Sequence, residues 1–240
     1  MLAAILSPGC PGVAAAQAEP SRGWTVTVEG ALVSRYIWRG EVLDKVNLQP
    51  DVHVSARAVT IGVWSAWGVE RNPDLNGRDY KEIDTYLSWD REFGAGELTL
   101  TGTDYYFPGP GDTGRFTNFG GVVNGQSTGA HTEEIAGQFT PSAVPVTCMV
   151  AWNAYNDPDH SLFAELSSQV SLRFVRLDGD IAFLLKDSPR FYHNLAGQAM
   201  EYALRATHSF SLRSFEPYVS AAVVRSAVVG RTYGVFAIGF

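Results

Sequence analysis

Apolar residues recur at every second position through almost the whole of this sequence from Trp24 onward. In the segment 161–174, for example, Leu166 and Val170 alternate with Glu165 and Gln169. Successive side chains of a β-strand point to opposite faces of the sheet, so each such segment has one apolar and one polar face. A helix would need an apolar repeat of three or four residues. The pattern therefore predicts an all-β fold.

Twelve segments share this alternation. They lie near residues 24–38, 48–57, 60–71, 81–91, 96–107, 131–140, 145–155, 161–174, 177–187, 199–211, 215–225 and 231–240. Short turns alternate with longer loops between them, and the longest loop is 108–130. An even number of antiparallel strands of about ten residues, connected in this way, is typical of outer-membrane barrels. We expect a transmembrane antiparallel up-and-down β-barrel of about 12 strands, formed by one domain over residues 19–240.

The composition argues against two other classes of protein. The chain has 25 acidic and 18 basic residues and a net charge of −7, whereas a nucleic-acid-binding surface must be basic. No run of 18 residues is continuously apolar, so we expect no membrane-spanning helix. Charged residues make up only 18% of the chain, below the roughly 25% of ordinary soluble domains.

The first 18 residues contain no charged side chain and end in Ala16-Gln17-Ala18, a small-x-small pattern that signal peptidase cuts after. We expect a signal peptide over 1–18, one that is incomplete because its apolar run is short and no basic residue precedes it. The alternative is a disordered N-terminal tail. Cleavage after Ala18 leaves Cys148 as the one thiol, which cannot form an internal disulfide.

Aromatic residues gather at the ends of the expected strands, as they do at the two interfaces of a barrel in lipid. Those at ends that meet long loops are Tyr36, Trp38, Trp67, Phe107, Trp152 and Tyr155. Those at ends that meet short turns are Trp24, Trp89, Phe139, Phe174, Phe210 and Phe240. We expect two aromatic girdles and a location in the bacterial outer membrane. In the alternative, a soluble β-sandwich, these residues form a core.

The chain ends at Phe240, in a strand with Phe236 and Ile238 on one face. This ending resembles the C-terminal signal by which the barrel assembly machinery recognises outer-membrane proteins. Backbone pairing gives the physical context, because only a closed sheet leaves no strand edge unpaired in lipid. The expected partners are therefore outer-membrane lipid, lipopolysaccharide and this machinery.

Five short segments carry a resemblance to a known family. They are Ser34–Gly40 (SRYIWRG), Asn47–Pro50, Gly62–Ser65, Glu82–Tyr86 and Tyr105–Pro108. Together they resemble the TorF-like family of porins, whose members open with a Ser-x-Tyr-x-x-Arg-Gly strand end. The resemblance covers about a third of the chain and implies a channel in the outer membrane of a Gram-negative bacterium. It indicates little about the solute.

With the apolar faces toward lipid, the charged residues of the other faces line the lumen. These are Glu29, Arg35, Arg39, Asp51, His53, Arg57, Asp84, Asp90, Glu134, Glu165, Arg173, Asp178, Asp180, Lys186, Glu201, Arg205, Arg213 and Glu216. The acidic group Glu165, Asp178 and Asp180 predicts a mild cation preference in a channel that passes small hydrophilic solutes or ions. In the alternative, acids and bases pair across strands and close the lumen.

The glycine-rich loop 108–130 is too long for an ordinary turn. Either it folds into the barrel mouth as a constriction, with Asp112 and Arg115 as its charges, or it is a mobile surface loop. A closed barrel would have a structural or adhesive role through this loop and through 187–198.

An enzymatic alternative depends on His53-Val54-Ser55, since some outer-membrane lipid hydrolases use a His-x-Ser strand. Those enzymes point the pair toward lipid, whereas here Val52, Val54 and Ala56 take that face. We therefore expect no enzymatic activity. The histidines show no metal-ligand spacing and no phosphate-binding glycine loop is present, so we expect neither metal nor cofactor.

Overall fold

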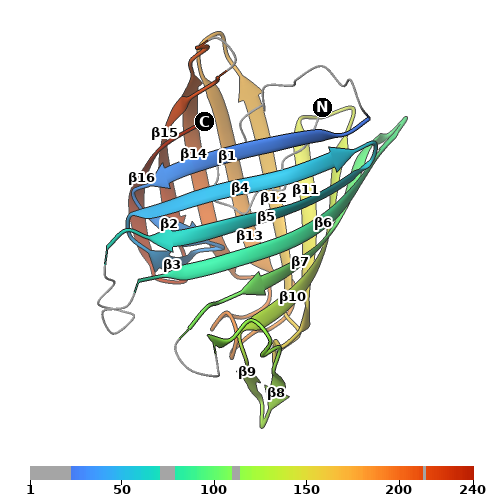
Figure 1. The fold of residues 1–240 in the computed structure, drawn as a ribbon, viewed down its shortest axis with the longest axis vertical. Coiled ribbons are helices and arrows are strands. Elements are labelled where there is room, and N and C mark those ends of the chain that lie inside the picture. The colour runs from blue at the N-terminus through green and yellow to red at the C-terminus, as the bar shows by residue number, and fades with distance from the viewer. Residues whose placement is uncertain (1–22, 71–78, 110–113, 213–214) are drawn as a thin grey trace.

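A computed structural model of the chain describes residues 23–70, 79–109, 114–212 and 215–240. Twelve of its strands form one closed antiparallel barrel, in the order β1-β4-β5-β6-β7-β10-β11-β12-β13-β14-β15-β16 and back to β1 (Figure 1). The described residues contain no α-helix, and hence none that is long and apolar enough to cross a membrane. The expected leader over 1–18, Asp112 and Arg213 lie outside the described residues.

The barrel strands have these bounds: β1 Thr25–Val33, β4 Asn47–Ala56, β5 Val59–Gly68, β6 Lys81–Phe93, β7 Gly96–Tyr106, β10 His131–Pro141, β11 Val146–Tyr155, β12 Leu162–Ser171, β13 Arg176–Leu184, β14 Ala199–Ser209, β15 Tyr218–Ser226 and β16 Arg231–Gly239. Two further hairpins stand apart from this sheet, β2 Tyr36–Trp38 with β3 Glu41–Asp44, and β8 Gly121–Val123 with β9 Gln126–Thr128. The prediction of an all-β, twelve-stranded antiparallel barrel is confirmed.

Closure depends on the pairing of the first and last strands. Ala31 pairs with Gly239 and Val33 with Ala237. Gly30 and Phe240 then exchange two backbone hydrogen bonds, of 3.2 and 3.0 Å, so the ladder continues to the last residue. Apart from this closing pair, each barrel strand pairs with the next barrel strand along the chain, and every pair is antiparallel, so no crossover connection is required.

Exposure alternates along the barrel strands with a period of two. On β15, Val219 and Val223 are exposed while Ala222 and Val224 are buried. This strand has apolar residues on both faces, so its sequence pattern does not say which face is outward, whereas the structure does. Large exposed apolar residues occur around the barrel, including Val26, Val28, Val52, Val54, Ile61, Val63, Leu87, Leu100, Ile135, Val150, Leu166, Leu204, Val219, Val223, Phe236 and Ile238. The buried faces carry many polar and charged residues, the reverse of a water-soluble protein.

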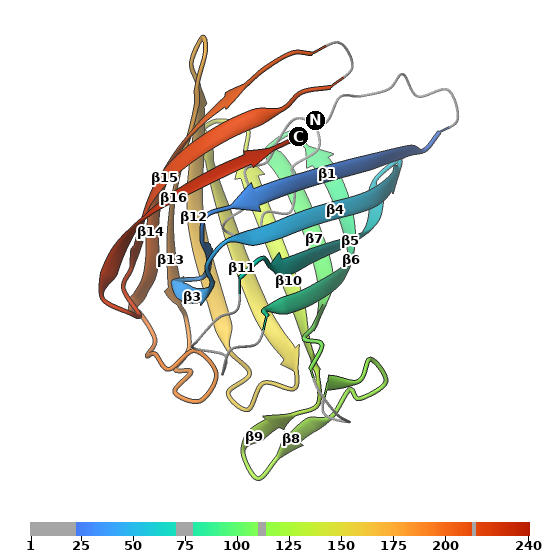
Figure 2. The same ribbon diagram turned by 60° about the vertical axis from the view of Figure 1, so that its left-hand side comes forward.

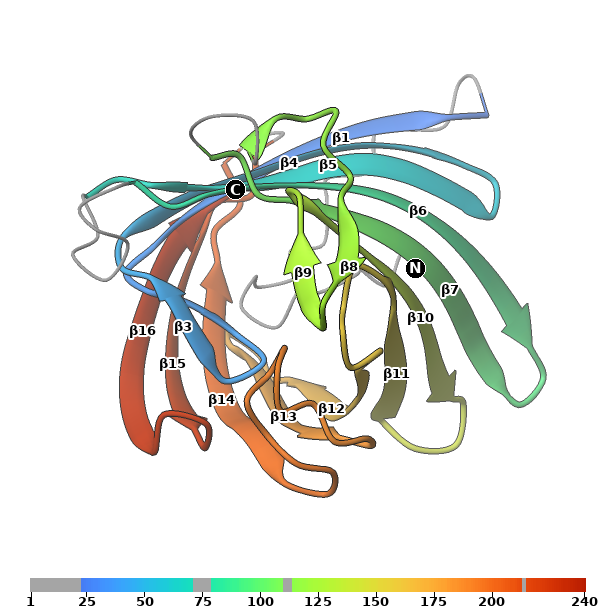
Figure 3. The ribbon, with the colours of Figure 1, turned by 90° about the horizontal axis from the view of Figure 1, so that it is seen from below.

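The prediction of one strand over 24–38 is wrong, because β1 ends at Val33 and the chain then leaves the wall. Residues 36–44 form the hairpin β2–β3, which we call the lumen hairpin. Figure 3, which looks into the end of the barrel with the long loops, shows it inside the ring of strands. Ile37 of the hairpin packs in one cluster with Ala222 and Val224 of the wall.

The β8–β9 hairpin of the long loop between β7 and β10 lies outside the barrel, unlike the lumen hairpin. It projects beyond the rim of the barrel (Figure 2). Its base packs on His131, whose ring stacks on Phe119 with centroids 4.2 Å apart and whose Nδ1 lies 2.9 Å from Asp104. The segment that enters the barrel is therefore the β1–β4 connection, whereas the described residues 114–130 of the long loop lie at and beyond the rim (Figure 2).

Candidate functional site

A two-residue turn at the tip of the lumen hairpin positions Arg39. Trp38 pairs with Glu41, and the two residues between them have positive φ, 51° for Arg39 and 79° for Gly40. Two successive positive φ values match a type I′ turn, in which glycine is ordinary and arginine is costly. The local sequence therefore holds an arginine in an unfavourable backbone conformation at the innermost point of the hairpin.

The guanidinium of Arg39 makes a bidentate ion pair with Glu134 of β10. Nη1 donates to Oε2 at 2.5 Å and Nη2 donates to Oε1 at 2.8 Å. Nη1 also donates to the hydroxyl of Tyr192 at 2.7 Å, and the hydroxyl of Tyr105 donates to Glu134 Oε1 at 3.0 Å. Arg39 is 2% exposed and Glu134 5%, so the pair depends on these added hydrogen bonds to offset the loss of water.

Two aromatic rings flank the same guanidinium. Its Cζ lies 4.1 Å from the ring centroid of Phe163 on β12 and 4.5 Å from that of Trp38. Cation–π contacts of this kind are worth about 2 kcal/mol when desolvated. We call the group formed by Glu134, Tyr105, Tyr192, Phe163 and Trp38 around Arg39 the Arg39 site.

Further contacts anchor the hairpin to the barrel wall. The backbone N–H of Gly40 donates to Glu201 Oε2 at 2.7 Å, and the Gly40 carbonyl accepts a hydrogen bond from Ser226. Tyr36 packs between Trp64 and Tyr80, with ring centroids 5.7 Å apart in each case. The hairpin is therefore held at its tip by polar contacts and at its base by aromatic packing.

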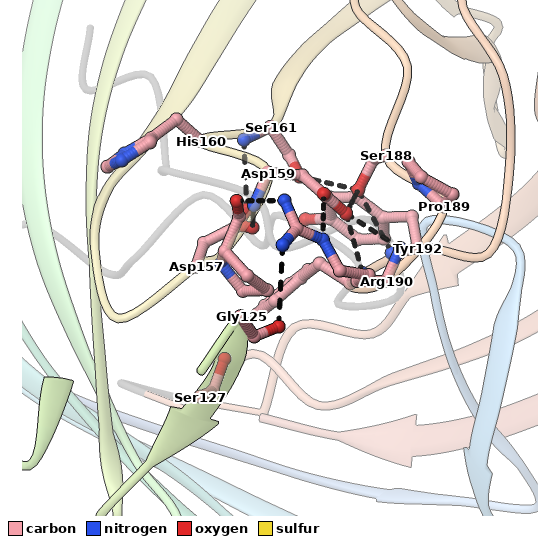
Figure 4. Close-up of polar contacts among 12 residues, drawn as sticks. Gly125, Ser127, Asp157, Asp159, His160, Ser161, Ser188, Pro189, Arg190 and Tyr192 are labelled. Carbon is pink, nitrogen blue, oxygen red and sulfur yellow. Dashed lines mark hydrogen bonds and ion pairs between the residues drawn. The ribbon is translucent and has the colours of Figure 1, made fainter. Parts of the chain in front are cut away.

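A polar network at the rim supports Tyr192 (Figure 4). Asp159 accepts hydrogen bonds from the backbone N–H of Arg190 at 2.7 Å, from its Nε at 2.7 Å and from the N–H of Phe191 at 3.0 Å. Burial alone would raise the pKa of Asp159, but these donors from Arg190 and Phe191 outweigh it and lower the pKa. Ser188 Oγ accepts from the backbone N–H of Tyr192 at 3.1 Å. We call this group the rim network.

The rim network also joins loops that are remote in sequence. Ser161 of the β11–β12 loop and Ser188 of the β13–β14 loop have their hydroxyls 2.6 Å apart. Asp157 accepts from Asn153 Nδ2 and from the N–H of Ser161, both at 2.9 Å, which fixes the first of these loops. A continuous set of contacts therefore runs from the outer rim through Tyr192 to Arg39.

Acidic residues dominate the wall around the Arg39 site. Five of them are largely buried, on β6, β12, β13 and β14: Glu82, Asp84, Glu165, Asp180 and Glu201. Asp84 Oδ1, Glu165 Oε2 and Asp180 Oδ2 have no hydrogen-bond partner among the described residues. Arg205 of β14 interacts electrostatically with Glu165, Asp180 and Glu201, so these acids have a basic partner on the wall besides Arg39.

No set of three or more His, Cys, Asp and Glu residues within the described part of the chain has the geometry to hold a metal ion.

A second polar group lies nearer the end with the short turns. Asp51 accepts from the hydroxyl of Tyr86 at 3.0 Å and lies 2.7 Å from His53 Nδ1. The hydroxyl of Ser55 is 2.8 Å from that of Thr60. His53 and Ser55 thus have separate partners, an arrangement that does not resemble a nucleophile and base pair.

The structure divides the predicted lumen residues into two sets. On the polar faces of barrel strands lie Glu29, Asp51, His53, Asp84, Asp90, Glu134, Glu165, Asp178, Asp180, Glu201 and Arg205. In turns, loops or the lumen hairpin lie Arg35, Arg39, Arg57, Arg173, Lys186 and Glu216. Arg57 and Arg173 are exposed in short turns, so the structure does not place them on the wall as predicted.

The girdle prediction is wrong for Tyr36 and Trp38, which are 2% and 7% exposed inside the barrel. They follow the strand period of β1, yet they belong to the lumen hairpin. Other predicted girdle residues are exposed at strand ends or in the adjoining turns: Trp24, Trp67, Phe107, Trp152, Phe174, Phe210 and Phe240. Trp89 and Phe139 are partly exposed.

Three members of the Arg39 site carry no local sequence signal for a role in the lumen. Tyr105 belongs to a segment of the family resemblance, Phe163 to an alternating segment, and Tyr192 to the loop 187–198. Tyr192 lies in a loop without periodicity and is fully buried. Its sequence neighbourhood contains no signal for this role, because its partner Arg39 is 153 residues away.

Fold and site together define a closed twelve-stranded antiparallel β-barrel with a polar interior that is filled, toward its long loops, by an inserted hairpin. The chain belongs to a family described as a bacterial protein of unknown function (Gcw_chp), whose model matches residues 17–177. The match spans the lumen hairpin and the barrel strands from β1 to β12. No curated protein matches the sequence significantly.

Proposed function

We propose that this protein is an outer-membrane barrel that provides a gated path for small hydrophilic solutes or ions, with the lumen hairpin as the gate. The observation that carries the proposal is the division of the barrel into an exposed apolar outer face and a charged interior. Leu204 is 61% exposed and Ile61 60%, while Glu201 and Asp84 are buried. Lipid is the solvent that suits the outer face, and water or a polar solute suits the inner one.

The lumen hairpin, a segment separate from the wall, fills the interior. A separate segment of this kind favours a movable gate over a fixed constriction formed by the wall itself. The resemblance to TorF-like porins supports a channel, and the acids Glu165, Asp178 and Asp180 support a mild cation preference. Asp178 pairs with Arg176 at 3.1 Å, which leaves Glu165 and Asp180 as the acids with unpaired oxygens.

Single-channel conductance in a planar lipid bilayer tests the proposal. We expect low conductance from the wild type and a several-fold increase when residues 35–45 are replaced by a short glycine-serine linker. The matched control replaces residues 121–128, the β8–β9 hairpin outside the barrel, and is expected to leave conductance unchanged. Reversal potentials in a salt gradient would then report the cation preference.

A second candidate is a closed barrel with a structural or adhesive role. The dense packing at the hairpin favours it, since Tyr192, Leu184 and Met200 are all 0% exposed. Absence of current from both the wild type and the 35–45 variant, with insertion verified by circular dichroism, would reject the gated path in favour of this role.

A further inference from the structure

We propose that the Arg39 site is a binding site for organic cations that carry a guanidinium or primary ammonium group, and that Arg39 occupies it as a tethered copy of such a solute. This inference rests on the proposed solute path and names its substrate class. The hairpin then acts as a competitor that closes the path when no cationic solute is bound.

The groups around Arg39 form a complete recognition set for a planar cation. Glu134 offers two oxygens in bidentate geometry, Phe163 offers a ring face, and Tyr192 offers a hydroxyl acceptor. Tyr105 fixes the carboxylate by donating to it. These four residues belong to the wall or to the β13–β14 loop, and only Trp38 belongs to the hairpin. Removal of the hairpin would leave most of the recognition set in place.

The unpartnered acids around the site also favour a cationic occupant. Asp84 is 3% exposed, its Oδ1 has no partner among the described residues, and it interacts electrostatically with Glu134. Glu165, with its own unpartnered oxygen, interacts with Asp180 and with two basic residues, Arg39 and Arg205. Buried carboxylates without partners are costly. Since no described group has metal-ligand geometry, an organic cation satisfies them better than a divalent metal ion.

The hairpin can leave the site without opening the barrel wall. β1 and β4 pair continuously from Thr25–Ser55 to Val33–Asn47, so the hairpin is an insertion between two strands that already meet. β2 and β3 form a separate two-stranded sheet and share no ladder with the wall. A sheet of this size has little stability alone, so its position depends on the contacts at Arg39, Gly40 and the aromatic base.

The test uses the full chain refolded in detergent and compares Arg39→Ala with wild type. Ethylguanidinium is the probe, and ethylurea is its neutral control of similar shape. In Arg39→Ala we expect ethylguanidinium to raise the thermal unfolding midpoint at concentrations at least tenfold below those at which ethylurea acts. In planar bilayers the same probe should block the current of this variant. Wild type should respond weakly, because Arg39 fills the site.

Two further variants make the outcome specific. Arg39→Ala combined with Glu134→Gln should lose the response to ethylguanidinium, and Arg35→Ala, which removes the neighbouring lumen arginine, should not create one. Equal responses of Arg39→Ala to the two probes, or an unchanged response in the double variant, would overturn the inference. If Arg39→Ala does not refold, recovery of folding by ethylguanidinium but not by ethylurea supports the site, and no recovery rejects it.

The thermal unfolding midpoint tests the cation site, and the current in planar bilayers tests the proposed solute path, so the two proposals can fail separately. A probe-dependent shift in the unfolding midpoint with no current in any variant would retain the cation site and reject the path. Current without a probe-dependent shift or block would retain the path and reject the site.

Discussion

At the scale of single residues, Arg39 is the centre of a buried polar network inside the barrel. Its guanidinium lies on the barrel interior side of a strained turn, between two rings, with a bidentate carboxylate. A buried charge of this kind is tolerated only with excellent geometry. Two ion pairs hold this geometry, Arg39–Glu134 in the lumen and Arg190–Asp159 at the rim.

Glu134→Gln removes the charge that balances Arg39 while preserving shape. Breaking a buried pair in this way costs about 3–5 kcal/mol of unfolding free energy, and the hairpin should be released more often. Urea unfolding in lipid vesicles measures the loss of unfolding free energy, and single-channel conductance measures the release of the hairpin. Glu133→Gln, at the exposed neighbouring position, is the control and should change neither. Unaltered stability in Glu134→Gln would mean that the pair does not hold the hairpin.

Asp159 gives a pH dependence with a defined sign. Its pKa is lowered below the ordinary value of 3.8, so its stabilising effect is present at neutral pH and is lost as pH falls through the lowered pKa. The protection factors for hydrogen exchange of residues 185–198, which correct for the intrinsic pH dependence of amide exchange, should fall in that acidic range. In Asp159→Asn exchange should already be fast at neutral pH and show no acid transition there. An acid transition of the same size in the variant would assign it to another group.

At the scale of elements, the two hairpins that interrupt the order of the wall strands lie in different places, β2–β3 inside the barrel and β8–β9 outside it (Figures 2 and 3). The lumen hairpin carries apolar side chains that pack in two clusters, Ile37 with Ala222 and Val224, and Tyr36 and Trp38 with the aromatic residues around the Arg39 site. The β8–β9 hairpin has polar contacts to the rim, such as Thr128 N–H to Asn156 Oδ1 at 3.0 Å. The lumen hairpin brings two large aromatic side chains into contact with the wall, whereas the β8–β9 hairpin has only the small apolar side chains Val122 and Val123, both exposed. Burial of the larger apolar surface favours the inner position for the first hairpin.

Gly40→Ala tests how closely the hairpin tip fits the wall. A Cβ at this position would collide with the backbone carbonyl of Met200, and the φ of 79° is itself unfavourable for alanine. We expect displacement of the tip, with a lower thermal midpoint and raised conductance. Gly230→Ala also has a positive φ, of 71°, but no atom within 4 Å of the added Cβ. Gly230→Ala is therefore the control that has the backbone strain without the collision. Equal changes in thermal midpoint and conductance for the two substitutions would exclude a role for the collision.

At the scale of the whole molecule, the apolar outer face decides where the barrel can reside. A water-soluble protein rarely exposes a continuous apolar surface of this extent. The other requirement of a lipid environment is a sheet that closes on itself. The barrel meets it through a short seam, where Ala31–Val33 of β1 pair with Ala237–Gly239 of β16.

Leu204→Arg tests this placement. Leu204 is 61% exposed near the middle of β14, where an outward arginine should cost about 2–4 kcal/mol in a bilayer. Urea unfolding in phospholipid vesicles measures the cost. Val229→Arg, in the exposed turn between β15 and β16, is the control and should cost little. A neutral effect of Leu204→Arg would argue that this face does not meet lipid.

The sequence alone determined the class of fold, the number of wall strands and most of their facing. Alternation is a local property, because each strand shows its two faces in its own residues, and the count of such segments sets the size of the barrel. Alternation also predicts that Glu134, Glu165 and Glu201 lie on the polar face of the wall, where the structure has them.

Only the tertiary structure decided that residues 36–44 leave the wall. A short inserted hairpin has the same period of two as a wall strand, so Tyr36 and Trp38 looked like girdle residues of β1. The pairing of Arg39 with Glu134 joins positions 95 residues apart, and it exists only because closure of the barrel brings β10 to the tip of this hairpin. Local patterns fix strands, whereas the contents of the lumen depend on which distant segments the closed sheet encloses.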